Sequence, residues 1–485
     1  MDLKPCKLLV DGKWIEPAGG RYFETLNPAT EEPITEVAEG DSRDVERVVE
    51  VARRAFDSGP WPKLTPSGRR TVLEKMATLL IERAEEFALL ETLDTGKPIS
   101  QSKTRDLPFA CEILRYYAGW ADKIYGTTLP AGPTGFGYTL REPVGVVGMI
   151  TPWNSPLVLS LMKIAPALAA GNVLIHKPAS LTPLTAYRFA QLALEAGLPP
   201  GVLNVITGPG HTVGKAIVTH PLVDKISFTG ETVTGKEIMR DGSETLKRVS
   251  FELGGKSPHI IFADAPSLDE AATLAARGFC VNQGQICWAG SRLFVEAAIH
   301  DQLVEKLLSK VKQDWKIGDP MDPATSMGPL ISRSHLTHVQ EYIAEGKKGG
   351  AQLVLGGDRP NGKGYFLNPT VFDKVSNRMR IAREEIFGPV LAVIPFKDLQ
   401  DVVTQANDTC YGLAAGIWTS DITKAHRLAR LIRAGSVWIN TYGALNVAAP
   451  FGGFKHSGVG REMGQDALQL FTEGKSVWVN LGNIL

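Results

Sequence analysis

Hydrophobic and polar positions recur with two different periods along most of the chain. Apolar residues recur at helical spacing over 41–56, behind an Asp/Ser cap, and again over 69–93, where the pattern stops at Gly96. From Val144 onward, short apolar runs alternate with turns and helical patterns. Such alternation predicts parallel strands with crossover helices, a Rossmann-like sheet that binds its ligand at the carboxyl ends of the strands.

The alternation divides into two series, which meet near Gly254 and Gly255. The first series predicts strands at 144–150, 173–176, 203–206 and 225–228, and helices at 156–170 and 183–195. The second predicts strands near Ile260, Phe294, Val354, 391–394, 415–418 and 437–439, and helices at 268–277, 301–313, 336–346 and 422–432. We therefore expect two α/β domains, as the length of 485 residues also suggests.

Two further segments fit neither series. Residues 126–138 are rich in Gly, Pro and Thr and resemble an extended arm, and 476–479 read as a lone strand. Neither has an evident partner within its own domain. This favours pairing in an oligomer interface over the alternative, a surface hairpin.

Composition narrows the class of protein. Lys plus Arg equals Asp plus Glu at 52 each, so no overall field favours nucleic acid or an acidic membrane. The five cysteines are widely spaced, which argues against a disulfide framework or a metal site and favours a reducing compartment. The N-terminus lacks the apolar region of a signal peptide, and the most apolar stretch, 156–171, is too short to span a bilayer. The expectation is a cytoplasmic protein.

The most informative chemistry lies in two runs that are 35 positions apart (287 − 252). Glu252 stands in a Phe-Glu-Leu-Gly-Gly-Lys run, and Cys287 ends an Asn-Gln-Gly-Gln-Ile-Cys run. A thiol nucleophile with a carboxylate base is what covalent catalysis requires. The predicted domain boundary lies between them, so we expect the two residues on opposite sides of an interdomain cleft.

Other motifs follow predicted strands. Residues 230–236 match most of a P-loop, but Glu237 stands where a hydroxyl should hold magnesium, so a strand, turn and helix N-terminus is the better interpretation. The glycine run 208–214 has one residue too many for the usual dinucleotide fingerprint. Asn154 ends a Thr-Pro-Trp-Asn run and suits an oxyanion donor, together with the Cys287 N–H. Glu385 and Phe387 would point the same way in an extended chain.

Together these runs resemble the NAD(P)-dependent aldehyde dehydrogenase superfamily. The motifs appear in order, from Asn27-Pro-Ala-Thr to the final strand. The resemblance implies an NAD(P)-binding domain (1–122 and 144–254), a catalytic domain (255–456) and a small β oligomerisation arm (123–143 and 471–485). It also implies a homodimer or homotetramer that acts on a small-molecule aldehyde.

The resemblance assigns the catalytic roles. Cys287 would attack the aldehyde to form a thiohemiacetal, with Asn154 as oxyanion donor, and Glu252 would activate the water that hydrolyses the later thioester. Lys163 and Glu462 would relay protons from that base.

The resemblance also implies NAD and NADP as cofactors. One departure concerns Ser180, where strict NAD users of the family often carry Glu. Because Ser180 does not repel the extra phosphate of NADP and Lys177 could attract it, we expect NADP to be accepted. The implied cofactor-binding residues are Ile150, Thr151, Pro152, Trp153, Lys177, Ser180, Gly210, Phe228, Thr229, Gly230, Glu231, Leu253, Glu385 and Phe387.

A substrate tunnel follows from the same positional match. Its residues are mostly aliphatic and include no arginine, so a medium-sized apolar aldehyde, aliphatic or aromatic, fits better than a carboxylate-bearing semialdehyde. Betaine aldehyde is disfavoured because an aromatic cage is lacking. The implied residues are Ser155, Leu159, Met162, Val281, Ile286, Trp288, Leu445 and Phe451.

Three alternatives stay open. A CoA-acylating relative would share Cys287 but characteristically lacks a base such as Glu252. A cysteine hydrolase would need a histidine near the thiol, and only His456 lies in a plausible loop. A structural homologue without activity could have lost the nucleophile or the base, and both are present.

Overall fold

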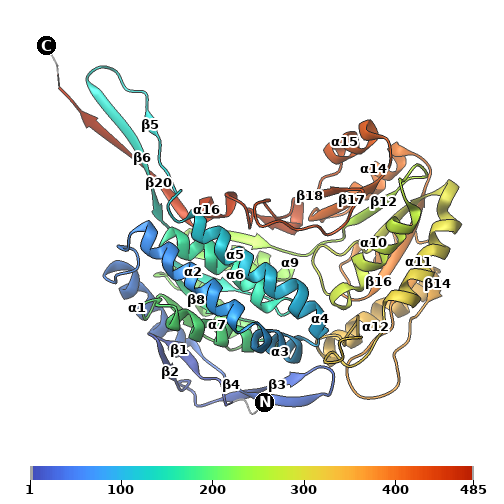
Figure 1. The fold of residues 1–485 in the computed structure, drawn as a ribbon, viewed down its shortest axis with the longest axis horizontal. Helices are drawn as coiled ribbons and strands as arrows, with labels where there is room; N and C mark the ends of the chain where they lie inside the picture. The colour runs from blue at the N-terminus through green and yellow to red at the C-terminus, as the bar shows by residue number, and fades with distance from the viewer. Residues whose placement is uncertain (1–3, 483–485) are drawn as a thin grey trace.

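The computed structural model describes residues 4–482. The predicted domain limits also include residues 1–3 and 483–485, which lie outside the described part. The chain forms two lobes, each built on a mainly parallel sheet, and an arm that projects from the first lobe (Figure 1). The predicted α/β class with parallel sheets is confirmed.

The first lobe holds an eight-stranded sheet whose five central strands are parallel. In spatial order its strands are β19 (Gly458–Val459), β11 (Arg248–Glu252), β10 (Lys225–Thr229), β7 (Val146–Ile150), β8 (Val173–Lys177), β9 (Leu203–Val205), β1 (Leu8–Val10) and β2 (Lys13–Ile15). Two further strands, β3 (Tyr22–Asn27) and β4 (Glu32–Ala38), form a separate hairpin.

Helices cover both faces of this sheet with apolar side chains. One face packs against α2 (Pro66–Glu82), α3 (Ala84–Thr95), α5 (Leu107–Trp120), α6 (Pro156–Ala170) and α7 (Leu184–Glu195). The other packs against α1 (Ser42–Asp57), α8 (Lys215–Thr219) and α9 (Thr232–Gly242). Helix α6 is buried along almost its whole length, as expected of a helix that is apolar all round.

The second lobe holds a seven-stranded sheet. In spatial order its strands are β14 (Gln352–Leu355), β15 (Thr370–Asp373), β16 (Val390–Phe396), β13 (Arg292–Glu296), β12 (Pro258–Ile261), β17 (Ala414–Trp418) and β18 (Ser436–Ile439). One face packs against α10 (Leu268–Cys280) and α11 (His300–Asp314). The other packs against α12 (Arg333–Lys348), α13 (Arg380–Arg383), α14 (Leu399–Asn407) and α15 (Ile422–Leu431).

The chain passes from the first lobe to the second directly after strand β11. Strand β11 ends at Glu252 in the first sheet, and β12 begins at Pro258 in the second. The chain returns to the first lobe near its end, where β19 pairs with β11 and the short helix α16 (Asp466–Leu470) packs on α6. The second lobe is therefore an insertion between two strands of the first sheet.

One predicted helix is two helices. The pattern over 69–93 is divided at Arg83, which has φ −111° and ψ 22° and therefore leaves the helical region. Ion pairs from Arg83 to Glu195 and from Arg188 to Glu86 hold the second piece, α3, against α7. Tertiary contacts thus divide a helix that the apolar pattern alone predicts to be continuous. The predicted end of the helical pattern at Gly96, which has φ 73°, is confirmed.

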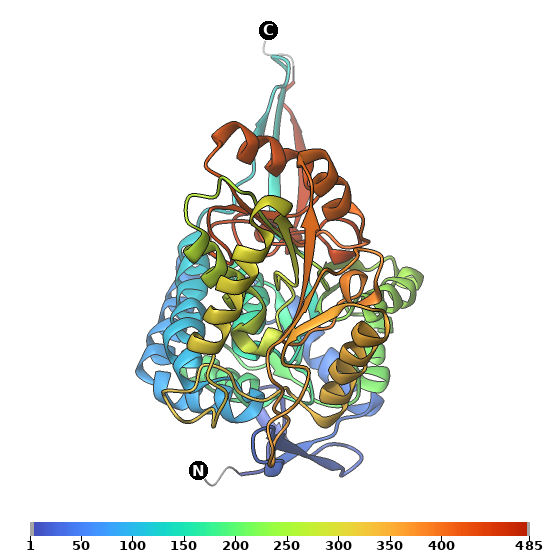
Figure 2. The ribbon, with the colours of Figure 1, turned by 90° about the vertical axis from the view of Figure 1, so that its right-hand side faces the viewer.

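The arm is a three-stranded antiparallel sheet of β5 (Thr128–Leu129), β6 (Gly135–Pro143) and β20 (Thr472–Asn480). Figure 2 shows it at one end of the molecule, beyond both lobes. The two segments, for which the sequence showed no evident partner within their own domains, pair with each other: β6 and β20 pair from Pro143 and Thr472 outward. The sequence pattern could not show this, since about 330 positions separate the two strands.

Candidate active site

Cys287 follows a turn with an unusual backbone. Asn282, Gln283 and Gly284 have φ values of 50°, 58° and 70°, so three consecutive residues are left-handed, two of them with a side chain that makes this conformation costly. Hydrogen bonds hold the turn: the Gln283 amide donates to Gly96 O at 3.2 Å, and the Asn282 amide donates to Asn154 O at 2.8 Å. Strain of this kind persists where surrounding structure imposes it, which is typical of functional sites.

Asn154 lies against the same turn. Its Nδ2 donates to Gln285 O at 2.9 Å, and its side chain is buried. An amide nitrogen carries two hydrogens, so one N–H is held by Gln285 and the other remains to stabilise charge beside Cys287. The structure therefore brings together the predicted nucleophile and the predicted oxyanion donor.

The Cys287 thiol is set in an unfavourable environment for a thiolate. Burial raises its pKa, and the carboxyls of Glu385 and Glu252 raise it further. The backbone N–H groups of Trp288 and of Cys287 itself act in the opposite direction. The thiol is thus largely protonated at rest and must lose its proton during the reaction.

Glu252 is the last residue of β11 and is buried near Cys287. Its Oε2 has no hydrogen-bond partner in the described part of the chain. Burial raises the pKa of Glu252 well above its usual range, and the nearby Glu462 adds to this while Lys163 and Arg461 oppose it. A carboxyl with a raised pKa is a suitable general base near neutral pH.

Lys163 and Glu462 form a buried ion pair behind this base. Lys163 lies in the middle of α6, and Glu462 lies in the segment that returns to the first lobe. The Oε2 atom of Glu462 has no hydrogen-bond partner in the described residues. All five predicted catalytic residues therefore occupy one region where the two lobes meet, although they come from distant parts of the sequence.

The predicted cofactor residues line one edge of the first sheet. Strand register pairs Ile150 with Lys177 and with Phe228, and Thr229 with Glu252, so the carboxyl ends of four parallel strands stand in a row. The turns beyond them add Thr151, Pro152, Trp153, Gly230, Glu231 and Leu253. This is the edge where doubly wound sheets bind nucleotides.

Residues at this edge fit a dinucleotide. The Thr229 hydroxyl is buried without a hydrogen-bond partner in the described part, and a Cβ on Gly230 would meet the Phe228 ring, as a close turn requires. Helix α9 begins directly after Glu231, so its N-terminal amides face the same space. The match of 230–236 to a P-loop is thus a strand, turn and helix N-terminus, as the sequence analysis favoured.

Lys177 and Ser180 follow β8. Lys177 is buried, its Nζ donates to Pro178 O at 3.2 Å, and burial lowers its pKa to about 8. Ser180 donates to Gly208 O at 3.3 Å, and Gly210 begins the short π-helix 210–214. The glycine run thus approaches Ser180 rather than forming the usual fingerprint turn.

Glu385 and Phe387 come from the second lobe. Glu385 accepts a hydrogen bond from Gly255 N at 3.0 Å, and burial raises its pKa to about 7. The extended conformation expected for this segment was wrong, because Phe387 is left-handed with φ 56°. Its ring packs edge-on against Trp153 at 5.2 Å, so the two lobes are in contact through predicted cofactor residues.

Four of the predicted substrate residues share an apolar cluster with Cys287, and two more lie in the turn before it. Leu159, Met162, Phe451 and Trp288 belong to the same apolar cluster as Cys287, and Val281 and Ile286 are buried in the turn before it. Ser155 lies at the start of α6, whereas Leu445 is 40% exposed and outside the cluster. Sequence reasoning missed Gln101, whose Oε1 accepts a hydrogen bond from Asn282 N at 3.3 Å, because no local motif marks it.

A cavity of about 280 Å³ lies elsewhere in the molecule, and none of the predicted site residues lines it. It lies among β3, α3 and the loop at Pro320. Among residues 4–482 no group of His, Cys, Asp and Glu could hold a metal ion, and no helix has the length and apolar character to cross a membrane.

Comparison with known proteins identifies the family. The model of the aldehyde dehydrogenase family matches residues 14–477. The NADP/NAD-dependent aldehyde dehydrogenase PuuC of Escherichia coli is 46% identical over 98% of this chain and 96% of its own length. The chain therefore belongs to the aldehyde dehydrogenase family.

Solved structures agree with this assignment. Aldehyde dehydrogenase KauB of Pseudomonas aeruginosa superposes with a TM-score of 0.97 at 49% identity, covering 98% of this chain and 96% of that one. The indole-3-acetaldehyde dehydrogenase AldA of P. syringae, a mutant solved with NAD+ and IAA, has a TM-score of 0.97 at 46% identity, with coverage of 98% and 97%.

The raised pKa of the Cys287 thiol predicts slow alkylation. Only the thiolate reacts with iodoacetamide, so we expect the rate at Cys287 to rise about tenfold per pH unit between about pH 7 and 9 without levelling. Glu385→Gln removes a negative charge and should increase the rate. Peptide mass spectrometry measures the alkylation rate at Cys287 in both proteins. The exposed Cys410 of the same chain serves as the internal reference for the reactivity of iodoacetamide. A plateau below about pH 8 would contradict the assignment.

Proposed function

We propose that the chain oxidises an aldehyde to its carboxylic acid with NAD or NADP. The observation that carries the proposal is the convergence of Cys287, Asn154 and Glu252 where the two lobes meet, beside a sheet edge that fits a dinucleotide. The relatives named as NAD(P)-dependent enzymes support the same reaction. The buried base argues against a CoA-acylating enzyme, and the presence of both nucleophile and base argues against an inactive homologue.

The reaction begins at the Cys287 sulfur. Once its proton has moved to a base, the thiolate attacks the aldehyde carbon, and the carbonyl oxygen becomes an oxyanion. The Asn154 amide and the Cys287 backbone N–H can both donate to that oxygen. The turn is already fixed by Asn282, so little reorganisation is needed to form this thiohemiacetal.

The chemistry that a bound NAD or NADP would supply is a hydride acceptor for the thiohemiacetal carbon. Thr229, Lys177 and Glu385 are the residues that would hold the cofactor. Release of the acid then depends on Glu252, which takes a proton from water so that the hydroxide attacks the thioester carbon. The carbon–sulfur bond breaks, the acid leaves, and the Cys287 thiolate is restored. The Lys163–Glu462 pair lies beside Glu252 and can receive that proton.

The walls near the sulfur favour an apolar substrate. Leu159, Met162, Trp288 and Phe451 share an apolar cluster with Cys287, which supports a medium-sized aliphatic or aromatic aldehyde as the substrate. A cytoplasmic location is part of the proposal, since the cysteines form no disulfide in the described residues.

The arm is proposed as the interface of a homodimer or homotetramer. Strand β20 is an unpaired edge, and the arm exposes large apolar side chains, with Trp478 62% and Phe136 45% exposed. Unpaired edges and apolar patches of this kind are usually covered by a partner.

Replacement of Glu252 should separate formation of the thioester from its hydrolysis. In Glu252→Gln we expect about one equivalent of reduced cofactor per subunit in a burst, then a steady rate lowered about 10²–10⁴-fold, because the thioester forms but is not hydrolysed. Stopped-flow absorbance at about 340 nm measures both phases. Glu270→Gln, an exposed change on α10, should behave as the parent. An unchanged steady rate in Glu252→Gln would refute its role.

Cofactor choice tests the role of Ser180. We expect kcat/KM with NADP within about tenfold of that with NAD. Ser180→Glu should lower the NADP value about a hundredfold and spare NAD, because a carboxylate repels the added phosphate. A parent enzyme that prefers NAD by more than about a hundredfold would overturn the expectation.

The arm can be tested through the mass of the assembly. Trp478→Glu puts a charge into the exposed apolar face and should reduce the oligomer to monomers in light scattering. Leu246→Glu, at an 88% exposed position outside the arm, should leave the mass unchanged. A monomeric parent, or an unchanged mass in Trp478→Glu, would contradict this interface.

A further inference from the structure

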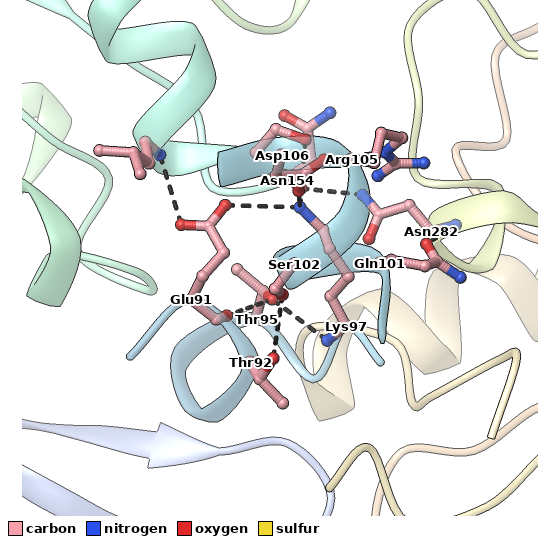
Figure 3. Close-up of polar contacts among 12 residues, drawn as sticks. Glu91, Thr92, Thr95, Lys97, Gln101, Ser102, Arg105, Asp106, Asn154 and Asn282 are labelled. Atoms are coloured by element: carbon pink, nitrogen blue, oxygen red, sulfur yellow. Dashed lines mark hydrogen bonds and ion pairs between the residues drawn. The ribbon is translucent and has the colours of Figure 1, made fainter. Parts of the chain in front are cut away.

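The left-handed turn 282–284 contains a buried backbone donor that the first lobe satisfies. Asn282 is buried, and its backbone N–H donates to Oε1 of Gln101 at 3.3 Å. Figure 3 shows Gln101 beside Asn282. A buried N–H that has no acceptor is destabilising, so the strained turn depends on a side chain from the other lobe.

The other half of the Gln101 amide is also hydrogen-bonded to the second lobe. Its Nε2 donates to Ser326 O at 2.8 Å. Ser326 lies in the loop between α11 and α12, and its own backbone N–H donates to Lys316 O at 3.0 Å. One side chain of the first lobe thus joins two backbone groups of the second lobe. This contact requires a group that both donates and accepts, as an amide does.

The backbone that carries Gln101 is itself held in place. Gln101 ends the short helix α4 (Ile99–Gln101), and the N–H of the first residue of α4 donates to Pro320 O at 2.8 Å. Lys97, just before α4, is fully buried and pairs with Asp106, just after it (Figure 3). The side chain that contacts the turn therefore extends from a fixed part of the first lobe.

The same segment also supports the helix that follows Asn154. Helix α6 begins two residues after Asn154, and its N-cap residue makes no side-chain hydrogen bond to the helix. The carboxyl of Glu91 accepts the N–H of Leu157 at 3.4 Å and so takes the place of that cap. Residues 91–101 therefore contact both the helix after Asn154 and the turn before Cys287.

We propose that Gln101 is a positioning residue that fixes the turn before Cys287 against the first lobe, where Asn154 lies and where the cofactor would bind. The inference rests on the proposed aldehyde oxidation and adds to it a residue that acts through Asn282. Neither partner of Gln101 is a predicted cofactor or substrate residue. Loss of the contact should therefore slow the chemical step without weakening binding, because a shift of about 1 Å between reacting groups can lower the rate about a hundredfold.

The test measures hydride transfer in a single turnover, with the enzyme in excess over NAD. The substrate is the aldehyde that the parent oxidises fastest in a panel from acetaldehyde to octanal and benzaldehyde. The absorbance of reduced cofactor then reports the step before the thioester is hydrolysed. Gln101→Met has a similar size but cannot donate, so we expect this rate to fall about 10–100-fold. The steady-state KM for the aldehyde and the affinity for NAD should stay within about threefold of the parent.

A second variant and a control make the test specific. In Gln101→Glu the carboxylate repels Ser326 O at high pH, whereas the protonated carboxyl can donate to it and still accept the Asn282 N–H. Its rate relative to the parent at the same pH should therefore rise at least about fivefold from about pH 9 to about pH 6. Gln405→Met is the matched control, because Gln405 is also half-buried and donates to Asp401 Oδ1 at 2.9 Å. It should keep the parent rate.

The outcomes separate the positioning role from the proposed function. A Gln101→Met rate within about threefold of the parent overturns the positioning role alone, as does a change confined to KM or to NAD affinity. An equal loss in Gln405→Met does the same. Should Gln101→Met fail to fold, the pH profile of Gln101→Glu decides, and a flat ratio to the parent overturns the role. A parent that oxidises no aldehyde of the panel overturns the proposed function and the positioning role with it.

Discussion

The site depends on the left-handed turn at residues 282–284. A residue with a side chain costs on the order of 1–2 kcal/mol in this conformation, so a turn with two of them does not form on its own. Hydrogen bonds to Gly96 O, Asn154 O and the Gln101 side chain hold it in place. Helices that contribute neither nucleophile nor base are therefore necessary for the position of Cys287.

A second constraint is electrostatic. Burial raises the pKa of Cys287, Glu252 and Glu385, and the two carboxyls raise the pKa of the Cys287 thiol further. The site thus opposes a thiolate at rest, and the backbone N–H groups of Trp288 and Cys287 are what favour it. This arrangement limits side reactions of the thiol and explains why a carboxyl can serve as a base near neutral pH.

Local features of the sequence predicted much of the fold. Helix α6 was predicted with its observed limits, and the strand ends at Lys177 and Thr229 were close to the structure, because burial on both faces gives continuous apolar runs. Errors arose where distant contacts decide the conformation. Arg83 divides a helix because α3 packs on α7, and Phe387 is left-handed in a segment expected to be extended.

In the candidate site, too, residues in local motifs were predictable from the sequence, whereas contacts between distant segments were not. Cys287, Glu252 and Asn154 stand in distinctive runs, so their chemistry was evident from the sequence. No local pattern marks Gln101, whose Oε1 accepts a hydrogen bond from Asn282 N at 3.3 Å. Only the folded chain shows this contact, because the two residues are 181 positions apart in the sequence.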